Sequence, residues 1–289
     1  MIKKGIILAG GLGSRMSPLT KAVNKQLLPL YDKPLIFYPL SILMLAGIKD
    51  ILIIVNKGQL SQFKKILPEK NNLGLKIIYK EQLKPAGLPQ AFTIGEKFIG
   101  KDNVSLILGD NFFYGQSLTK ILKRNISFKK GAKVFLHPVK NPNQYGVASL
   151  DKKRKVIKLI EKPKKTKSNL AVTGLYFFDN KVIERAKKLK PSSRGELEII
   201  DLLNIYKRKG NLSAEFIGRG GAWLDTGNVK DYYDASNFVS AIENRQGLKI
   251  ACLEEISLKN NWINKKEIKK SISFYGNCDY SKYLKSLIN

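Results

Sequence analysis

A glycine-rich loop and two basic side chains near the N-terminus are the first residues that could do chemistry. An apolar run reaches Leu8 and continues into the loop AGGLGSR at residues 9–15, and Lys25-Gln26 follows ten residues later. Glycines allow backbone N–H groups to turn toward an anion at close range. A guanidinium and an ammonium beside such a loop would neutralise phosphate oxygens. The segment is therefore a candidate anion site at the end of a short buried strand.

Neither of two well-known phosphate motifs fits this loop. A P-loop needs a lysine at a fixed spacing after its glycines, and none stands there. The dinucleotide fingerprint needs a third glycine where this chain has Met16. Two interpretations stay open for the loop alone: a nucleotide-binding loop, or an ordinary glycine-rich turn between a strand and a helix.

Two aspartates follow apolar runs and are candidates for a metal site. Asp110 ends the run LILG at residues 106–109, and Asp225 lies in the segment WLDTG at residues 223–227. A buried carboxylate is costly unless a cation or hydrogen-bond donors satisfy it. Two carboxylates together with substrate phosphates are a typical Mg²⁺ site. The alternative is that each aspartate caps a turn or a helix.

The composition is strongly basic, which raises the question of nucleic acid or membrane binding. The 289 residues include 52 Lys and Arg against 23 Asp and Glu, a formal charge of +29. The lysines are spread along the chain, and no nucleic-acid-binding motif is recognisable. The longest apolar stretch, residues 34–48, is shorter than a membrane span requires. We therefore expect neither a nucleic-acid nor a membrane partner.

The cysteine and histidine content limits the remaining chemistry. Cys252 and Cys278 are far apart and form no CxxC pair, and His137 is the only histidine. This usage fits a reducing cytoplasm and argues against a disulfide or zinc framework. A single histidine excludes a multi-histidine metal site.

Eight segments together resemble the sugar-1-phosphate nucleotidylyltransferases. The loop GGLGSR and the segment NKQLLP at residues 24–29 are typical of that family. Six later segments, in family order, narrow the resemblance to its glucose-1-phosphate thymidylyltransferases: residues 108–111, 145–147, 161–163, 167–176, 194–198 and 223–227. Each segment is weak alone, and together they are specific and cover nearly the whole chain.

The resemblance implies a reaction between dTTP and glucose 1-phosphate. An oxygen of the sugar phosphate would attack the α-phosphorus, with Mg²⁺ on Asp110 and Asp225, giving dTDP-glucose and pyrophosphate for dTDP-rhamnose or other deoxysugar supply. The family further implies a cytoplasmic homotetramer. Two alternatives remain, the same chemistry with UTP and a sugar-nucleotide-binding protein without catalysis.

The resemblance also assigns roles to individual residues. Arg15, Lys25, Lys162 and Arg194 would be catalytic, because they would neutralise phosphate charge. The implied nucleotide-binding residues are Leu8, Gly10, Gly11, Gly13, Ser14, Arg15, Lys25, Gln26, Gln82, Gly87 and Asp110. The implied sugar-phosphate-binding residues are Asn111, Tyr145, Gly146, Glu161, Lys162, Val172, Gly174 and Arg194. For Glu161-Lys162 the alternative is a surface ion pair, and for Arg194 a cation on a loop leading into a helix.

The chain departs from the family pattern in the region that would bind a nucleotide effector. Gln116, Gly221, Leu253 and Lys259 replace residues usual there. Lysine lacks the planar fork of arginine, so feedback by dTDP-rhamnose is left open.

Alternating apolar strands and helices predict an α/β fold with a doubly wound, mostly parallel, Rossmann-like sheet. We expect strands at 6–9, 51–55, 76–79 and 104–108, helices at 36–46, 61–67 and 90–98, and added antiparallel strands at 132–138, 147–150, 156–160 and 171–178. Further on we expect a helix at 196–209, a strand at 214–217, and helices at 229–243, 265–271 and 280–287. The expected domains are a nucleotidyltransferase unit, 1–240, with a nucleotide part to about 115 and a sugar part after it, and a C-terminal helical appendage, 241–289.

Overall fold

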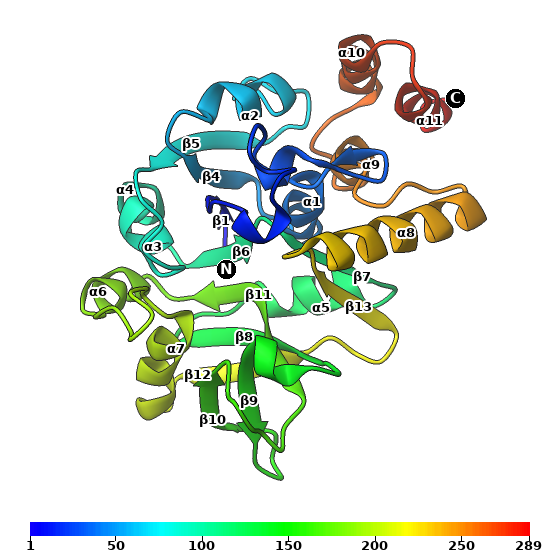
Figure 1. Ribbon diagram of the computed structural model, residues 1–289. Coiled ribbons are helices and arrows are strands. Elements are labelled where there is room, and N and C mark those ends of the chain that lie inside the picture. Colours follow the sequence, from blue (N-terminus) through cyan, green and yellow to red (C-terminus); the bar gives the residue numbers. More distant parts are fainter.

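The apolar runs of the N-terminal half form the parallel centre of a nine-stranded sheet. The computed structural model describes residues 1–289 (Figure 1). Strands β6, β1, β4 and β5 lie side by side in parallel in that order. Their bounds are Lys4–Ala9 for β1, Asp50–Asn56 for β4, Lys76–Gln82 for β5 and Val104–Leu108 for β6. The expected doubly wound, mostly parallel arrangement is confirmed for this half.

An antiparallel extension continues the same sheet. β11 (Leu170–Phe178) pairs antiparallel with β6 and then with β8 (Ala132–Pro138) and β9 (Gly146–Leu150). β10 (Val156–Glu161) pairs with β9, and β12 (Leu212–Phe216) pairs parallel with β8. The expected antiparallel addition is thus confirmed, and it occupies the lower part of Figure 1.

Strands of the sheet centre are apolar without interruption because both of their faces are buried. In β1, Ile7 and Ala9 belong to one core layer, and Ile6 and Leu8 belong to the other. The first layer is covered by α1 (Phe37–Leu45), α2 (Leu60–Ile66) and α5 (Leu118–Asn125). The second is covered by α3 (Gln90–Ile94), α4 (Glu96–Ile99), α6 (Val182–Lys187) and α7 (Ile199–Arg208).

Two expected helices differ from the structure for identifiable reasons. The helix expected over 90–98 is divided at Gly95 into α3 and α4. A Cβ at Gly95 would lie 2.9 Å from the Ala91 carbonyl oxygen and 3.0 Å from Ile6 Cδ1, so the backbone there lies directly against the sheet. The helix expected from 196 begins at Ile199, because Leu197 is extended and forms a parallel bridge with Gly87.

Several short strands were not expected from the sequence. β7 (Asn111–Gly115) and β13 (Gly221–Asp225) form a separate antiparallel pair, and β2 (Pro29–Leu30) and β3 (Lys33–Pro34) form a small hairpin. The β7–β13 pair matters for the site because its register places Asp225 opposite Asn111.

The C-terminal helices pack on the N-terminal half through apolar and charged contacts. They are α8 (Val229–Gln246), α9 (Leu253–Lys259), α10 (Lys265–Tyr275) and α11 (Asp279–Ser286). Lys33 of the β2–β3 hairpin is buried and donates to Glu243 of α8 at 2.8 Å. The proposed division at residue 240 stays a prediction, and α8 runs across that position. No helix is both long enough and apolar enough to cross a membrane.

The appendage contains a buried carboxyl group that no cation faces within ion-pair distance. Glu254, 1% exposed, accepts a hydrogen bond of 2.7 Å from the Tyr280 hydroxyl. Burial raises the pKa of Glu254, although hydrogen bonds from Tyr280 and neighbouring side chains oppose this rise. A carboxyl group whose pKa is raised on folding stabilises the folded state most at pH values below its unfolded-state pKa. This stabilisation is lost as the pH rises through the folded-state pKa.

We therefore expect Glu254→Gln to raise the free energy of unfolding by about 1 kcal/mol at pH 8, with a smaller gain at pH 4. Chemical denaturation at the two pH values measures this. Equal effects at both pH values, or destabilisation at pH 8, would contradict the prediction.

Candidate active site

Every residue that the sequence predicted for the site lines one cavity of about 400 Å³. The cavity lies at the carboxyl ends of β1, β5 and β6, where parallel sheets commonly bind ligands. It extends from there to the antiparallel strands β9, β10 and β11. The residues are therefore brought together, and the individual roles assigned to them stay predictions.

The glycine-rich loop is held by an asparagine that sequence reasoning missed. The Gly11 N–H donates to Asn56 Oδ1 at 2.9 Å, and Asn56 Nδ2 donates to the Gly11 carbonyl oxygen at 2.8 Å. Gly11 and Gly13 both have positive φ, which glycine adopts without strain. The available signal was a polar residue ending a buried strand next to β1, the pattern already noted for Asp110.

A second asparagine folds the Lys25-Gln26 segment back to this loop. Asn24 Nδ2 donates to the Ala9 carbonyl oxygen at 3.2 Å, and Asn24 Oδ1 accepts from the Gln26 N–H at 2.8 Å. The turn Lys25–Leu27 therefore begins at the end of β1. Lys25 is 9% exposed as a result, and its ammonium pairs with the carboxylate of Asp110.

Gln82 lies against Gly10, which leaves no room for a side chain there. A Cβ at Gly10 would lie 2.3 Å from Gln82 Oε1. Gly10→Ala must therefore displace the Gln82 side chain. Because φ at Gly10 is not in the positive range, this substitution tests the contact and not backbone strain.

We expect Gly10→Ala to raise the KM for nucleotide about 10-fold, measured from initial rates. Gly218→Ala is the control, because a Cβ there meets nothing within 4 Å. An unchanged KM in Gly10→Ala would mean that Gln82 does not contact the nucleotide.

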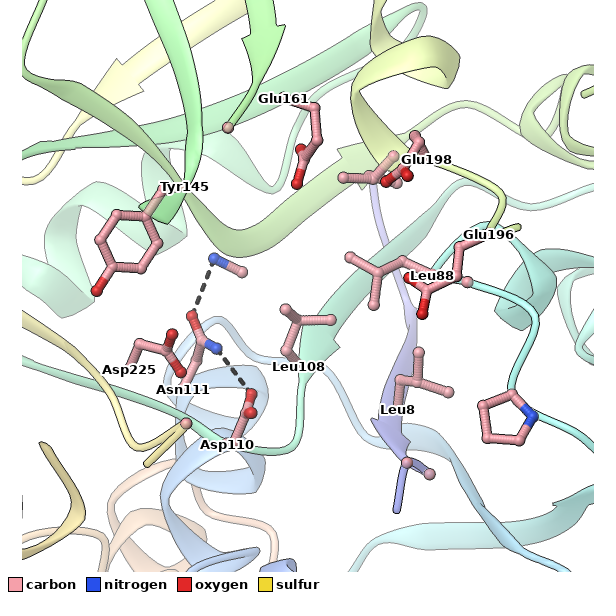
Figure 2. Close-up of a pocket in the computed structure, with 18 of the residues that line it drawn as sticks. Leu8, Leu88, Leu108, Asp110, Asn111, Tyr145, Glu161, Glu196, Glu198 and Asp225 are labelled. Atoms are coloured by element: carbon pink, nitrogen blue, oxygen red, sulfur yellow. Dashed lines mark hydrogen bonds between the residues drawn. The ribbon is translucent and has the colours of Figure 1, made fainter. Parts of the chain in front are cut away.

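The two candidate metal ligands come together through the β7–β13 pair. Figure 2 shows Asp110, Asn111 and Asp225 grouped on one side of the cavity. The Thr226 N–H and hydroxyl both donate to the Asp110 carbonyl oxygen, at 3.1 and 2.8 Å. These bonds attach the strand end carrying Asp225 to the end of β6. Gly227 lies beside Asp225 and Arg15, since its Cβ would be 3.1 Å from Asp225 Oδ1 and 3.2 Å from an Arg15 nitrogen.

The two carboxyl groups have opposite pKa shifts. Burial, followed by the negative charge of Asp110, raises the pKa of Asp225 to about 7, although Lys25 and Arg15 oppose this. Burial also acts on Asp110, but the charge of Lys25 and hydrogen bonds from Lys25 and Asn111 outweigh it and lower the pKa. A divalent cation between these carboxyl groups would relieve their repulsion.

The donor set fits Mg²⁺ in part. Two carboxylates are hard oxygen ligands of the kind Mg²⁺ prefers. No cluster of three or more Asp, Glu, His or Cys residues is present that could hold a metal without substrate. Phosphate oxygens and water would complete the coordination, which is usual for Mg²⁺ in phosphoryl-transfer sites.

The sugar side of the cavity contains a network around Arg194. Arg194 donates to both carboxylate oxygens of Glu198, at 3.0 and 2.7 Å, and to Glu161 at 3.3 Å. Ser192 Oγ also donates to Glu198, at 2.7 Å. Figure 2 shows Glu161 and Glu198 across the cavity from Asp110. Arg194 is thus held by two carboxylates. Neither of the two interpretations made from the sequence, a phosphate ligand or a loop cation, included these partners.

The cations of the site fall into two groups. Lys25 and Arg194 have carboxylate partners, whereas Arg15 and Lys162 form no ion pair within 4 Å. Lys162 has a positive φ of 40°, and its N–H donates to the Tyr145 carbonyl oxygen at 3.0 Å. Non-glycine residues in such conformations are found often at functional sites. Arg15 and Lys162 are therefore the cations available to an incoming anion.

Asn111 mainly holds its neighbours in place. Its Oδ1 accepts from the Gly174 N–H at 3.0 Å and from Trp223 Nε1 at 2.6 Å, and its Nδ2 donates to Asp110 at 3.0 Å. One N–H of Nδ2 remains for a ligand. The rings of Trp223 and Tyr145 also pack edge to face, with centroids 5.1 Å apart.

Sequence reasoning missed other residues that line the cavity. Glu196 and Glu198 had the clearest signal, since two acidic residues stand beside Arg194 in the sequence. Most of the rest are apolar or glycine and carry no chemical signal, although several lie within segments already named for the family resemblance: Leu108, Tyr176, Leu197, Trp223 and Gly227. The missed lining residues are Pro85, Leu88, Leu108, Gln144, Tyr176, Glu196, Leu197, Glu198, Ile199, Ile200, Trp223 and Gly227.

Comparison with known proteins shows the family to which this chain belongs. The family model described as nucleotidyl transferase matches residues 4–242, and the chain belongs to this family. The expectation of a nucleotidyltransferase is therefore confirmed.

Similar proteins of known name share one activity within this family. The chain is 50% identical over 285 residues to a glucose-1-phosphate thymidylyltransferase of Neisseria meningitidis, with 99% of each chain covered. It is 46% identical to the enzyme of that name from Mycolicibacterium smegmatis, again with 99% of each covered.

Two solved structures are also similar to this chain. A Bacillus anthracis chain named for the same activity, in complex with sucrose, is 40% identical and has a TM-score of 0.75, with 81% of this chain and 94% of that one covered. A UDP-glucose pyrophosphorylase in complex with UDP-glucose is 27% identical, with a TM-score of 0.74 over 85% of this chain and 100% of that one.

Proposed function

We propose that this chain converts dTTP and glucose 1-phosphate to dTDP-glucose and pyrophosphate. The observation that carries the proposal is the convergence of Arg15, Lys25 and Lys162 with Asp110 and Asp225 in one cavity. The similarity to relatives named glucose-1-phosphate thymidylyltransferase over nearly the full chain supports the choice of substrates.

The main barrier in this reaction is repulsion between two polyanions. A phosphate oxygen of the sugar forms a bond to the α-phosphorus, and the bond from that phosphorus to the bridging oxygen of pyrophosphate breaks. The attacking oxygen is already anionic, so no general base is needed. At 4 Å and an effective dielectric near 20, each like-charge pair costs about 4 kcal/mol.

The side chains of the cavity supply the opposing charge and the alignment. Arg15 and the loop N–H groups would bind the nucleotide phosphates, and Lys162 would hold the sugar phosphate. The Lys25 ammonium, which is paired with the Asp110 carboxylate, would contact the reacting phosphoryl group. Asp110 and Asp225 would hold Mg²⁺, which when bound supplies further positive charge to phosphate oxygens. Catalysis then comes from positioning and electrostatics.

Arg194 has a different role in this proposal from that of a free cation. Its Nε and Nη2 donate to Glu198, and Nη2 also donates to Glu161, so Nη1 is the nitrogen that would bind the sugar phosphate. The second carboxylate oxygen of Glu161, which Arg194 does not contact, would accept hydrogen bonds from sugar hydroxyls. Burial and the nearby charge of Glu198 raise the pKa of Glu161, so a hydroxyl donor there would be favourable.

Pyrophosphate release from a panel of nucleoside triphosphates, with glucose 1-phosphate and Mg²⁺, tests the proposal. We expect dTTP to give the highest kcat/KM and UTP to follow, since one methyl and one hydroxyl group distinguish them. A preference for UTP would move the assignment to the alternative named above. Binding of nucleotide with no turnover would support a protein that only binds sugar nucleotides.

We also propose that the chain assembles as a homotetramer and that its product enters dTDP-rhamnose or other deoxysugar synthesis. Support for both comes from the family resemblance alone. Light scattering of the purified protein tests the homotetramer. Identifying the enzymes that consume dTDP-glucose in the same cells tests the deoxysugar pathway.

A further inference from the structure

Two glutamines beside the cavity form a hydrogen-bonded chain whose direction is determined by the backbone. The Ala86 N–H donates to Gln90 Oε1 at 3.0 Å, and Gln82 Nε2 donates to the same oxygen at 2.6 Å. A backbone N–H can only donate, so the atom of Gln90 that it meets must be the carbonyl oxygen. The atom of Gln82 facing that oxygen must then be the NH₂ nitrogen.

This chain leaves Gln82 with one orientation. The side chain is 3% exposed and lines the cavity, whereas Gln90 lies behind it and does not. Gln82 Oε1 is turned toward Gly10 and accepts no hydrogen bond from the protein. Its Oε1 and the second N–H of Nε2 are therefore the groups that remain for a ligand.

A fixed amide distinguishes pyrimidines by the order of donor and acceptor along their edge. Thymine and uracil present a donor at N3 and an acceptor at O4. Cytosine presents an acceptor at N3 and a donor at N4. An amide that could rotate by 180° would pair with either edge, because rotation exchanges its oxygen and nitrogen. An amide held in one orientation pairs with only one of them.

We propose that Gln90 is a positioning residue that orients the Gln82 amide and thereby makes the site select a pyrimidine carrying an N3–H. The inference rests on the proposed function in that it takes the ligand at Gln82 to be the nucleotide base. Gln90 does not touch the base. It excludes cytosine through Gln82, because turning Gln82 around would set two carbonyl oxygens against each other.

The test compares dTTP with dCTP in variants of Gln90. Gln90→Met keeps the length of the side chain and removes the acceptor. Gln90→Glu is the matched control, because a carboxylate still accepts from Ala86 and Gln82. Gln90→Ser withdraws the acceptor without adding an apolar group and serves if Gln90→Met fails to fold. Initial rates of pyrophosphate release give kcat/KM, and calorimetry gives the Kd of each nucleotide without the sugar phosphate.

We expect the dTTP-to-dCTP ratio to fall about 10-fold in Gln90→Met and to be retained in Gln90→Glu, in both kcat/KM and Kd. Equal weakening of both nucleotides in Gln90→Met would indicate a merely structural role and overturn the inference. Loss of the ratio in Gln90→Glu would overturn it too. If wild-type protein releases no pyrophosphate, the proposed function fails, while the Kd ratio still decides the role of Gln90. A wild-type protein that binds neither nucleotide would refute both.

Discussion

Replacing Lys25 by alanine is expected to lower kcat by about 10³-fold while raising the KM for dTTP only a few-fold. Lys25 is almost fully buried and paired with Asp110, so its charge is fixed in a water-poor site and acts on the reacting phosphoryl group. Charge placed in this way stabilises a transition state more than a ground state. Steady-state rates over a range of dTTP concentrations, at saturating glucose 1-phosphate and Mg²⁺, measure both constants.

Lys25→Arg is the matched variant for this prediction. It keeps the charge, but its planar fork does not match the point contact that an ammonium makes with Asp110. We expect it to recover part of the lost kcat. A Lys25→Ala protein with near-normal kcat and a greatly raised KM would show that Lys25 contributes to binding alone.

Asp225→Asn is expected to raise the Mg²⁺ concentration needed for half-maximal activity at least about 10-fold and to lower kcat at every concentration. The amide keeps the size of the side chain but gives up one of the two anionic ligands. The same substitution should stabilise the metal-free protein at pH 8, because burial and the charge of Asp110 both disfavour the Asp225 carboxylate and raise its pKa to about 7. A magnesium titration of activity and a thermal melt in a chelator measure the two effects.

The Asp225→Asn prediction is specific because the substitution should weaken the use of Mg²⁺ and at the same time stabilise the metal-free protein. Asp234→Asn, an exposed substitution on α8 with the same change in charge, should change neither the Mg²⁺ requirement nor the melting temperature appreciably. An unchanged Mg²⁺ requirement in Asp225→Asn would remove Asp225 from the metal site. A lower melting temperature in chelator would contradict the repulsion inferred from the structure.

The sequence alone determined the central strands, the alternation of strands and helices, and many of the polar residues around the cavity. Strands such as β6 and β8 were predicted with their observed bounds because an apolar run with polar breaks is a local signal. The loop glycines, Arg15, Lys25 and the two aspartates were recognisable from their residue types, whereas candidates such as Gln82 and Val172 came from the family resemblance.

Only the tertiary structure decided which of these groups meet. The β7–β13 pair joins Asp225 to Asn111 across more than a hundred residues, and no local pattern announced those strands. The partners of Lys25 and Arg194, the glutamine chain behind Gln82 and the Asn56 contact with Gly11 were likewise not predictable. Hydrogen bonds and ion pairs between distant segments depend on how strands pair and loops close, so their geometry exists only once the chain has folded.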